Sequence, residues 1–199
     1  MDGPYSHADG VRIGAAIISG VHYLHDSLIT HRDLKTDNIM LTSVNRSYAD
    51  PQISDFGYAR TCAYGYRCYT VCGTPWYMAP EIWALTLPSA TFLQGYSFPV
   101  DVWSVGVVIY AMFAGYLPFD DDKRSIREQV LENDVCYDEM DWEHMPSMRA
   151  LVDAMLSTSS SARISANHAH QKVLVENASL KSCLRGDVFS VHACTPEDM

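Results

Sequence analysis

The residues best suited to chemistry lie in two short stretches of the sequence. The first holds Asp33, Lys35 and Asn38 within six residues, and the second begins at Asp55, seventeen residues after Asn38. Transfer of a phosphoryl group needs a side chain that orients the attacking hydroxyl and takes its proton, together with cations that neutralise the phosphates. An aspartate suits the first task, a lysine can contact the terminal phosphate, and aspartate and asparagine oxygens can hold Mg²⁺. These residues therefore indicate phosphoryl-transfer chemistry.

Local patterns predict the elements that must position these residues. Ser6 begins a capping-box pattern, after which apolar residues recur at helical spacing, so we expect an amphipathic helix over residues 7–26. Residues 38–41 and 52–54 have the composition of two short strands joined by a polar, turn-rich loop. The first chemical stretch then lies between a helix and a strand, where side chains can face a cleft.

The rest of the chain is predicted to be mostly helical. Residues 55–81 show neither helical nor strand periodicity, and so long a loop inside a compact domain is usually functional or disordered. Residues 100–114 are apolar almost all round, which predicts a buried central helix. Further helices are expected at 148–156 and 165–175, and from residue 176 the pattern fades into a tail.

Composition argues against some classes of partner. The chain has 199 residues, with 14 Lys and Arg against 24 Asp and Glu, for a formal net charge of −10. An acidic chain without a basic run is a poor candidate for binding nucleic acid or an anionic membrane, and it suits basic peptides better. The first residues are polar rather than a secretory signal, and the longest apolar run is too short to cross a bilayer, so we expect a cytoplasmic location.

The cysteines form no paired pattern, and in an intracellular protein free thiols are the expectation. Cys62, Cys68 and Cys72 do fall close together. A structural zinc site normally has four ligands with tighter pairwise spacing, and these three lack a fourth. A zinc site is therefore not favoured.

Four motifs, met in order along the chain, resemble those of eukaryotic-type protein kinases. The stretch HRDLKTDN at 31–38 is similar to the catalytic loop, and Asp55-Phe56-Gly57 is similar to the magnesium motif. Residues 79–81 resemble the end of the activation segment, and DVWSVG at 101–106 resembles the start of the central buried helix. The resemblance covers roughly residues 4–175. It implies a protein-kinase-like C-lobe, mainly α with a small β-hairpin element and a long activation segment.

The resemblance implies a role for each matching residue at the reaction centre. Asp33 would be the catalytic base, and Lys35 would contact the γ-phosphate of ATP. Asn38 and Asp55 would bind Mg²⁺, and Met40 would form the floor beneath the adenine. ATP and Mg²⁺ are therefore the implied cofactors.

The activation segment adds two threonines with implied roles. Thr74 would bridge Asp33 and Lys35, and this bridge, with a lysine two residues after the aspartate, resembles Ser/Thr kinases rather than tyrosine kinases. Thr70 stands where such kinases often accept an activating phosphate, with Arg32 as the receiving cation.

Other residues would support the site from behind. Glu81 would pair with Arg163 in a buried ion pair that anchors the activation segment. Asp101, whose position also suits a simple helix cap, would hydrogen-bond the backbone of the catalytic loop. His31 and Phe56 would be the members that this chain keeps of the family's regulatory stack.

Substrate preference and subfamily follow from weaker signals. Asp37 lies beside the expected substrate path and is a candidate contact for a basic substrate side chain, against the alternative of a solvated residue. Residues 120–122 are three aspartates, more typical of a solvated turn than of substrate attraction. Residues 72–81 and 115–119 look most like the calcium/calmodulin-dependent kinase group. Residues 176–199 lack the basic amphipathic helix of a calmodulin target, so calmodulin itself is not expected.

Two functions stay open. The sequence has no G-x-G-x-x-G, and Lys35 is its first lysine, so the family's Gly-rich loop and strand lysine have no counterpart. We therefore expect residues 1–175 to be the C-lobe portion of a kinase domain without its N-lobe, and 176–199 to be a tail. The first hypothesis is a protein Ser/Thr kinase that acts as part of a longer product. The second is a catalytically inactive lobe that serves as a binding or scaffold module.

Overall fold

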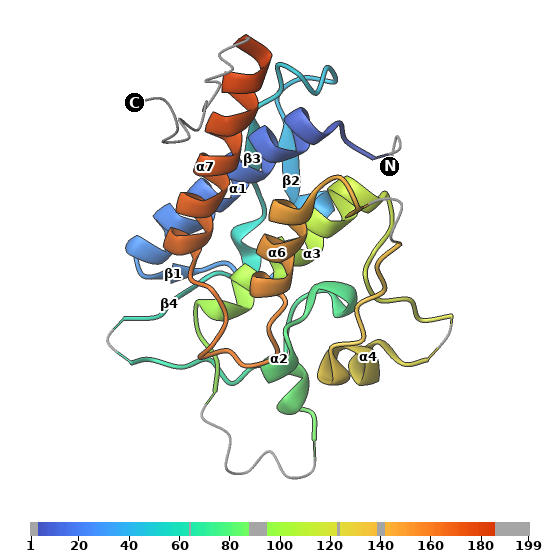
Figure 1. The fold of residues 1–199 in the computed structure, drawn as a ribbon. Coiled ribbons are helices and arrows are strands. Elements are labelled where there is room, and N and C mark those ends of the chain that lie inside the picture. Colours follow the sequence, from blue (N-terminus) through green and yellow to red (C-terminus); the bar gives the residue numbers. More distant parts are fainter. Residues whose placement is uncertain (1–3, 64, 88–94, 123, 139–141, 186–199) are drawn as a thin grey trace, which may run out of the picture.

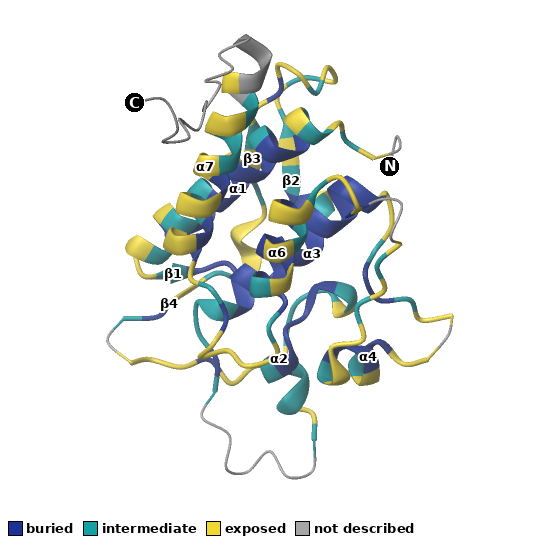
Figure 2. Cartoon of the chain, viewed as in Figure 1, coloured by how far each residue is buried: buried dark blue, intermediate teal, exposed yellow. Residues whose placement is uncertain are grey.

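A computed structural model describes residues 4–63, 65–87, 95–122, 124–138 and 142–185. At its centre lies helix α3 (Pro99–Ala114), whose residues from Val100 to Ala114 are all buried. Figure 2 shows this helix in dark blue inside the surrounding elements. The side chains are apolar almost all round the helix because every face meets another element, and the predicted buried central helix is confirmed.

Two long helices lie side by side, and the first of them packs against α3 (Figure 1). Helix α1 (His7–Asp26) begins at Ser6, whose hydroxyl accepts a hydrogen bond from the Asp9 N–H at 3.2 Å, as the capping pattern predicts. Helix α7 (Ala166–Arg185) packs along α1, and His7 at the start of α1 lies 3.5 Å from the Glu176 carboxylate. The helix expected at 165–175 therefore continues to residue 185, well into the stretch predicted to be a tail.

Helix α6 (Pro146–Met155) closes the other side of α3. The two helices approach closely at Gly106, where a Cβ atom would lie 3.0 Å from side-chain atoms of both Met155 and Leu156. A side chain there would require these neighbours to shift by a few tenths of an ångström, so the close packing favours glycine at this position.

Two small antiparallel sheets carry the loops that follow α1. Strand β2 (Ile39–Leu41) pairs with β3 (Pro51–Ile53), with Ile39 opposite Ile53, within a residue of the predicted bounds. A second pair, β1 (Ile29–Thr30) with β4 (Arg60–Thr61), was not predicted. Two residues are too few for a strand periodicity to be visible in a sequence.

Short elements complete the described part. The loop expected over residues 55–81 contains single turns of 3₁₀ helix at Phe56–Tyr58 and Pro75–Tyr77, and a third such turn, Thr36–Asn38, opens β2. Helices α2 (Pro80–Ala84) and α4 (Ile126–Glu132) contact each other. Within the residues described, no helix is both long and apolar enough to cross a membrane.

Candidate active site

The backbone of the catalytic-loop stretch is held from below by one buried carboxylate. Asp101, in the first turn of α3, is fully buried and accepts hydrogen bonds from the N–H groups of His31 and Arg32, each at 2.8 Å. Its Oδ2 atom also lies 3.0 Å from Nε2 of His25 in α1. Arg32 has the unfavourable backbone angle φ +73°, and two charge-assisted bonds at this point help to hold it there.

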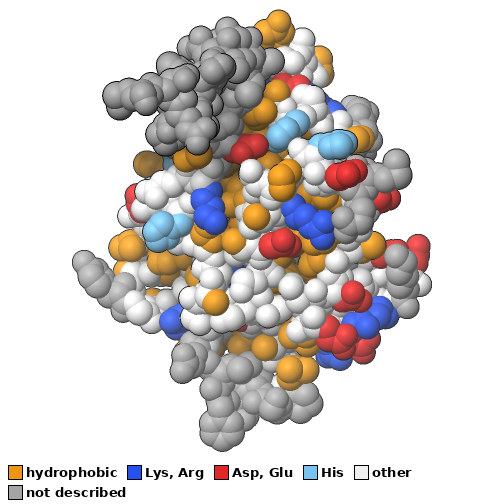
Figure 3. Space-filling model, viewed as in Figure 1, with side chains coloured by type: hydrophobic (Ala, Val, Ile, Leu, Met, Phe, Trp, Pro, Cys, Tyr) orange, Lys and Arg blue, Asp and Glu red, His pale blue; other side chains and the backbone are white. Residues whose placement is uncertain are grey.

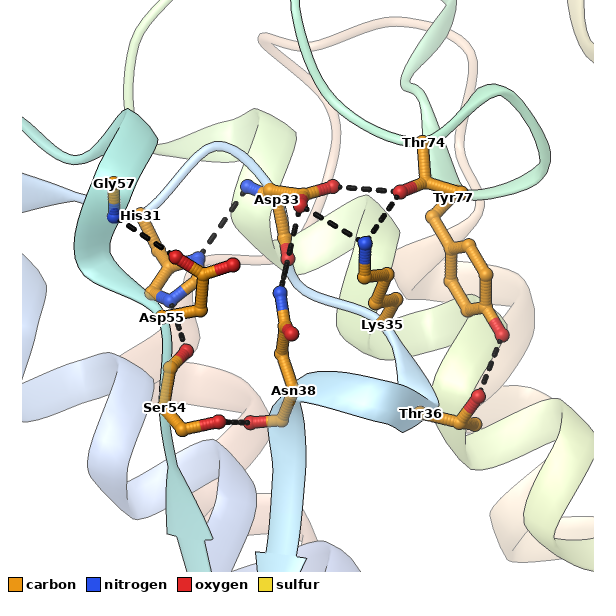
Figure 4. A network of polar contacts seen from close by, with 10 residues as sticks. All are labelled: His31, Asp33, Lys35, Thr36, Asn38, Ser54, Asp55, Gly57, Thr74 and Tyr77. Atoms are coloured by element: carbon orange, nitrogen blue, oxygen red, sulfur yellow. Dashed lines mark hydrogen bonds and ion pairs between the residues drawn. The ribbon is translucent and has the colours of Figure 1, made fainter.

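Three polar side chains meet above this loop (Figure 4). The Thr74 hydroxyl donates a hydrogen bond to Oδ1 of Asp33 at 2.8 Å. The Lys35 ammonium lies 3.2 Å from Oδ2 of Asp33 and donates to the Thr74 hydroxyl at 3.1 Å. The Asp33 side chain is 5% exposed and the Lys35 side chain 22%, so this is a partly buried ion pair with a third partner. The contact joins the catalytic loop to the activation segment.

Asn38 lies where the loop becomes strand β2. Its side-chain Nδ2 donates to the main-chain carbonyl of Asp33 at 2.8 Å. The main-chain carbonyl of Asn38 accepts from the N–H and the hydroxyl of Ser54, at 2.9 and 3.0 Å. Because Nδ2 is engaged, the amide orientation is set and Oδ1 is left as an available oxygen. In Figure 4 the side chains of Asn38 and Asp55 both project from the end of the hairpin toward Asp33.

Asp55 and its neighbours form the other wall. Asp55 is exposed, has a left-handed backbone with φ +59°, and one carboxylate oxygen accepts from the Gly57 N–H at 3.2 Å. Buried His31 accepts from the Asp33 N–H through Nδ1 at 3.3 Å and so donates through Nε2 to the Ser54 carbonyl at 3.0 Å. The Phe56 ring meets the His31 ring edge-on, with centroids 4.9 Å apart.

The activation segment reaches the catalytic loop through a glycine. Gly73 has φ +106°, and a Cβ atom there would lie 2.8 Å from the Arg32 carbonyl oxygen. Any other residue would be strained and would also push the segment away from the loop. The glycine therefore allows the adjacent Thr74 to reach Asp33.

The Arg32 guanidinium occupies a buried network. Its Nε donates to the Tyr58 carbonyl at 2.6 Å, and one terminal nitrogen donates to the Tyr96 hydroxyl at 3.2 Å. That hydroxyl in turn donates to the carbonyl of Thr70 at 2.6 Å. Burial raises the pKa of Tyr96, so the phenol remains a neutral donor. Tyr96 thus connects the catalytic loop to the predicted phosphosite through the Thr70 backbone.

Tyr77 links the same two segments further along. Its hydroxyl lies 2.9 Å from the hydroxyl of Thr36, and its carbonyl accepts from the Ser104 hydroxyl in α3 at 2.8 Å. Burial raises the pKa of Tyr77, which keeps the phenol protonated. The segment after Thr74 is therefore bonded to the catalytic loop and to the central helix.

The end of the activation segment is anchored by a bidentate ion pair. The two terminal nitrogens of Arg163 lie 2.7 and 2.9 Å from the two carboxylate oxygens of Glu81. The guanidinium also donates to the carbonyls of Pro99 and Ser157, each at 2.9 Å, and stacks over the Trp103 ring at 5.2 Å. The Arg163 side chain is fully buried, so all its polar atoms depend on these partners.

Not every predicted site residue joins the central cluster. Met40, on β2, is 56% exposed and is not among the hydrogen-bond partners of Asp33. Asp37 and Thr70 are also exposed, and within the described part of the chain the hydrogen bonds of the Arg32 guanidinium go to Tyr58 and Tyr96, not to the Thr70 side chain. The three aspartates at 120–122 are exposed too, close to α4, where Figure 3 shows acidic and basic side chains mixed rather than a uniform acidic patch.

Two residues with central contacts were missed by the sequence reasoning. Tyr96 belongs to no motif and lies more than sixty positions from Arg32, so no local pattern could have found it. His25 reaches Asp101 across a similar separation. The sequence predicted that His25 lies near the end of helix α1, but not that Asp101 is its partner.

The donor atoms suit a hard divalent cation. Asn38 offers a free amide oxygen, and Asp55 offers an exposed carboxylate with only one oxygen bonded to a backbone N–H. Mg²⁺ prefers oxygen ligands of this kind and usually keeps several waters. A phosphate-bound magnesium ion therefore fits the residues at this edge.

Taken together, the structure brings a helical lobe, a short hairpin and an aspartate–lysine–threonine cluster into one arrangement. The model of the protein kinase domain family matches residues 1–175. The chain belongs to this family, and the protein-kinase-like fold predicted from the sequence is confirmed.

The relatives are protein Ser/Thr kinases. The chain is 39% identical to the probable serine/threonine-protein kinase fhkE of Dictyostelium discoideum, over 78% of this chain and 22% of that protein. It is 34% identical to myosin light chain kinase A of the same organism, over 84% and 54%. It is 32% identical to calcium/calmodulin-dependent protein kinase type II of Caenorhabditis elegans, over 83% and 22%. The match thus spans only between about a fifth and about half of these relatives.

Proposed function

We propose that this chain supplies the catalytic-loop half of a protein Ser/Thr kinase, which transfers the γ-phosphoryl group of ATP to a Ser or Thr hydroxyl of a protein. The observation that carries the proposal is the mutual contact of Asp33, Lys35 and Thr74, within 2.8 to 3.2 Å. A buried aspartate held in one orientation beside a cation is what proton acceptance from an alcohol requires.

Each residue then has a task set by its surroundings. Asp33 orients the acceptor hydroxyl and takes its proton, while Thr74 fixes the carboxylate through Oδ1. Lys35 provides the positive charge for the γ-phosphate, and its partial exposure leaves it free to turn from Asp33 to the nucleotide. Asn38 and Asp55 would hold Mg²⁺, which neutralises phosphate charge when bound.

Two exposed residues fit roles toward larger ligands. Met40 presents an exposed side chain in the middle of strand β2, where it would support the adenine from below. Asp37 is exposed beside the catalytic cluster, where a basic substrate side chain could approach it. We assign the chain to the calcium/calmodulin-dependent kinase group on the same footing, since relatives of that group are among those it matches.

Groups that clamp the nucleotide from above are not among the 199 residues, which lack a Gly-rich phosphate loop and any lysine before Lys35. Catalysis of phosphoryl transfer rests on positioning and charge stabilisation, so an unclamped nucleotide loses most of it. We therefore propose that residues 1–175 act as a C-lobe and are nearly inactive when expressed alone.

The test joins this chain to the N-lobe of a related kinase and measures transfer of radiolabelled phosphate to a basic protein substrate. We expect incorporation into Ser and Thr, lowered at least about 100-fold by Asp33→Asn. Asp26→Asn, at the exposed end of α1, is the control and should match the parent. Equal activity of Asp33→Asn and the parent would refute the proposed base. Robust, Asp33-dependent turnover by the chain alone would refute the need for a second lobe.

Thr70 is proposed as the principal activating phosphosite. A phosphate there adds about −1.5 to −2 charge close to the network of Arg32 and Tyr96, and it could order the segment through charge-assisted bonds. In the active fusion, Thr70→Ala should lower activity far more than Thr61→Ala, because Thr61 is an exposed residue of β4 without that placement. Equal effects of the two variants would remove the argument.

A binding or scaffold module is the second candidate, and one observation favours it. Met40 and Phe56, which lie within two residues of Asn38 and Asp55 along the sequence, are 56% and 47% exposed. Apolar side chains gathered on one edge commonly mark a contact surface for another protein. A chain that fails in the fusion assay but binds an isolated kinase N-lobe through Met40 would support this candidate.

A further inference from the structure

Two thiols of the activation segment lie close enough to react with each other. The Sγ atoms of Cys62 and Cys68 are 3.7 Å apart, and both residues are buried, at 4% and 7% exposure. Both cysteines are free, and neither takes part in the proposed phosphoryl transfer. A disulfide needs a separation of about 2.05 Å, so a modest rotation of the side chains would be enough.

The backbone holds both cysteines in place. The N–H of Cys62 donates to the Leu28 carbonyl at 2.7 Å, directly after strand β4. Cys68 exchanges two backbone hydrogen bonds with Tyr96, at 2.8 and 2.9 Å. The thiols therefore stand at the two ends of a short excursion of the chain, and its ends are fixed while Tyr66 near its tip is exposed.

We propose that Cys62 and Cys68 form a redox modification site, which closes to an intramolecular disulfide when the protein meets a hydroperoxide. The reaction removes one hydrogen from each thiol, and the two electrons reduce hydrogen peroxide to two molecules of water. It goes through two steps, each with a defined leaving group. The inference is independent of the proposed kinase function.

The surroundings assign an order to the two thiols. The Thr30 hydroxyl donates a hydrogen bond to the Cys62 sulfur at 3.3 Å, which holds this sulfur in place. Burial, and next the neighbouring Cys62, raise the pKa of Cys68 to about 11, which disfavours its thiolate. We therefore assign the first attack to Cys62. Its sulfur attacks one peroxide oxygen, the O–O bond breaks, and the other oxygen leaves as water with the Cys62 thiol proton, so that Cys62 becomes a sulfenic acid. The Cys68 sulfur then attacks the Cys62 sulfur, and the S–O oxygen leaves as water with the Cys68 proton.

The disulfide would affect the catalytic loop through Tyr96. The Tyr96 backbone is paired with Cys68, and its hydroxyl contacts the Arg32 guanidinium and the Thr70 carbonyl. A disulfide at the base of the excursion would fix this strand bridge and so restrict the segment that carries Thr70. Cys72, whose sulfur lies 3.4 Å from the Tyr96 hydroxyl, is the competing third thiol.

The experiment maps the linkage in the intact chain. The purified protein is treated with hydrogen peroxide, remaining thiols are alkylated, and the chain is digested with trypsin without reductant. Cleavage at Arg60 and Arg67 separates the Cys62 peptide, 61–67, from peptide 68–123, which holds Cys68 and Cys72. We expect a linked pair of these peptides that disappears with dithiothreitol. Absence of the pair from the oxidised protein, or its presence only in covalent dimers, would overturn the proposal.

Matched variants separate the three thiols. Cys72→Ser should keep the link, and Cys136→Ser, at an exposed cysteine outside the segment, should do the same. Cys68→Ser should lose the link and accumulate a sulfenic acid at Cys62 that dimedone traps. A link that survives in Cys68→Ser or vanishes in Cys72→Ser would assign the partner to Cys72 and overturn the pair. Circular dichroism of each variant checks the fold, and the Cys72→Ser digest decides the pairing even where Cys68→Ser does not fold.

Discussion

The rear and the front of the catalytic loop are held in different ways. At the rear, Asp101 and Arg163 are buried and each makes several hydrogen bonds between 2.7 and 3.0 Å. At the front, Asp55 is exposed with one backbone hydrogen bond, and Met40 is more than half exposed. The difference teaches that contacts within the chain fix the position of the proposed catalytic groups, while the surface proposed to meet a nucleotide is held by few of them.

Removal of the rear ion pair should have the largest effect. Arg163→Ala leaves the Glu81 carboxylate and the carbonyls of Pro99 and Ser157 without their donor, so we expect a loss of about 3 to 5 kcal/mol in the free energy of unfolding. Urea denaturation measures it. Arg124→Ala is the control, because Arg124 pairs with Glu132 at the surface and its removal should cost far less. Similar losses in both variants would contradict the buried-rear description.

Neutralising the carboxylate beneath the loop should cost less. Asp101→Asn replaces a carboxylate that accepts through both oxygens by an amide with one oxygen and one NH₂ group. The NH₂ group would then face one of the N–H donors of His31 and Arg32. We expect a loss of about 1.5 to 3 kcal/mol in the free energy of unfolding. The matched control is Asp26→Asn, another aspartate with a histidine partner on α1, whose side chain is 70% exposed. An Asp101→Asn variant as stable as the control would show that the charge is not needed there.

Alkaline pH should weaken the protein through its buried acids. Burial raises the pKa of Cys68 from 9.0 to about 11, so above pH 9 the unfolded chain loses this proton before the folded chain does. The folded state then binds more protons, and the free energy of unfolding falls as pH rises from about 9 to 11, on the order of 1 kcal/mol for this group. Urea denaturation at several pH values should show a shallower fall in Cys68→Ser than in Cys136→Ser. Identical slopes would contradict the assignment.

Changes at the front should have the smallest effect on folding. Met40→Gln places a polar chain at a site that is already 56% exposed, so we expect less than about 0.5 kcal/mol of change in the free energy of unfolding. Thermal unfolding by circular dichroism measures it, and Met148→Gln, in the buried face of α6, is the contrasting variant. A large loss for Met40→Gln would mean that the front edge is part of the core after all.

The sequence was sufficient for elements whose pattern is local. Helices α1 and α3 and the β2–β3 hairpin follow from periodicity and caps, and the catalytic residues follow from contiguous motifs. The contacts of Tyr96 and His25 could not be predicted, since each depends on a tertiary partner far along the chain. The predicted end of helix α7, at residue 175, is too early. The apolar spacing weakens after that residue, but no glycine or proline interrupts residues 166–185, so the helix continues. The catalytic and binding roles themselves stay predictions.

The Asp101 carboxylate has a consequence for the order in which the molecule folds. Its bonds to the catalytic loop join residues about seventy positions apart, and the Glu81–Arg163 pair joins residues 82 apart. Closing such long segments is slow compared with forming a helix, because chain entropy must be lost before these contacts form. During synthesis, α1 can form early, whereas the catalytic loop gains its geometry only after α3 has left the ribosome, and the activation segment is anchored later still. Nascent chains stalled before residue 101 should therefore show protease-sensitive catalytic loops on an already helical α1.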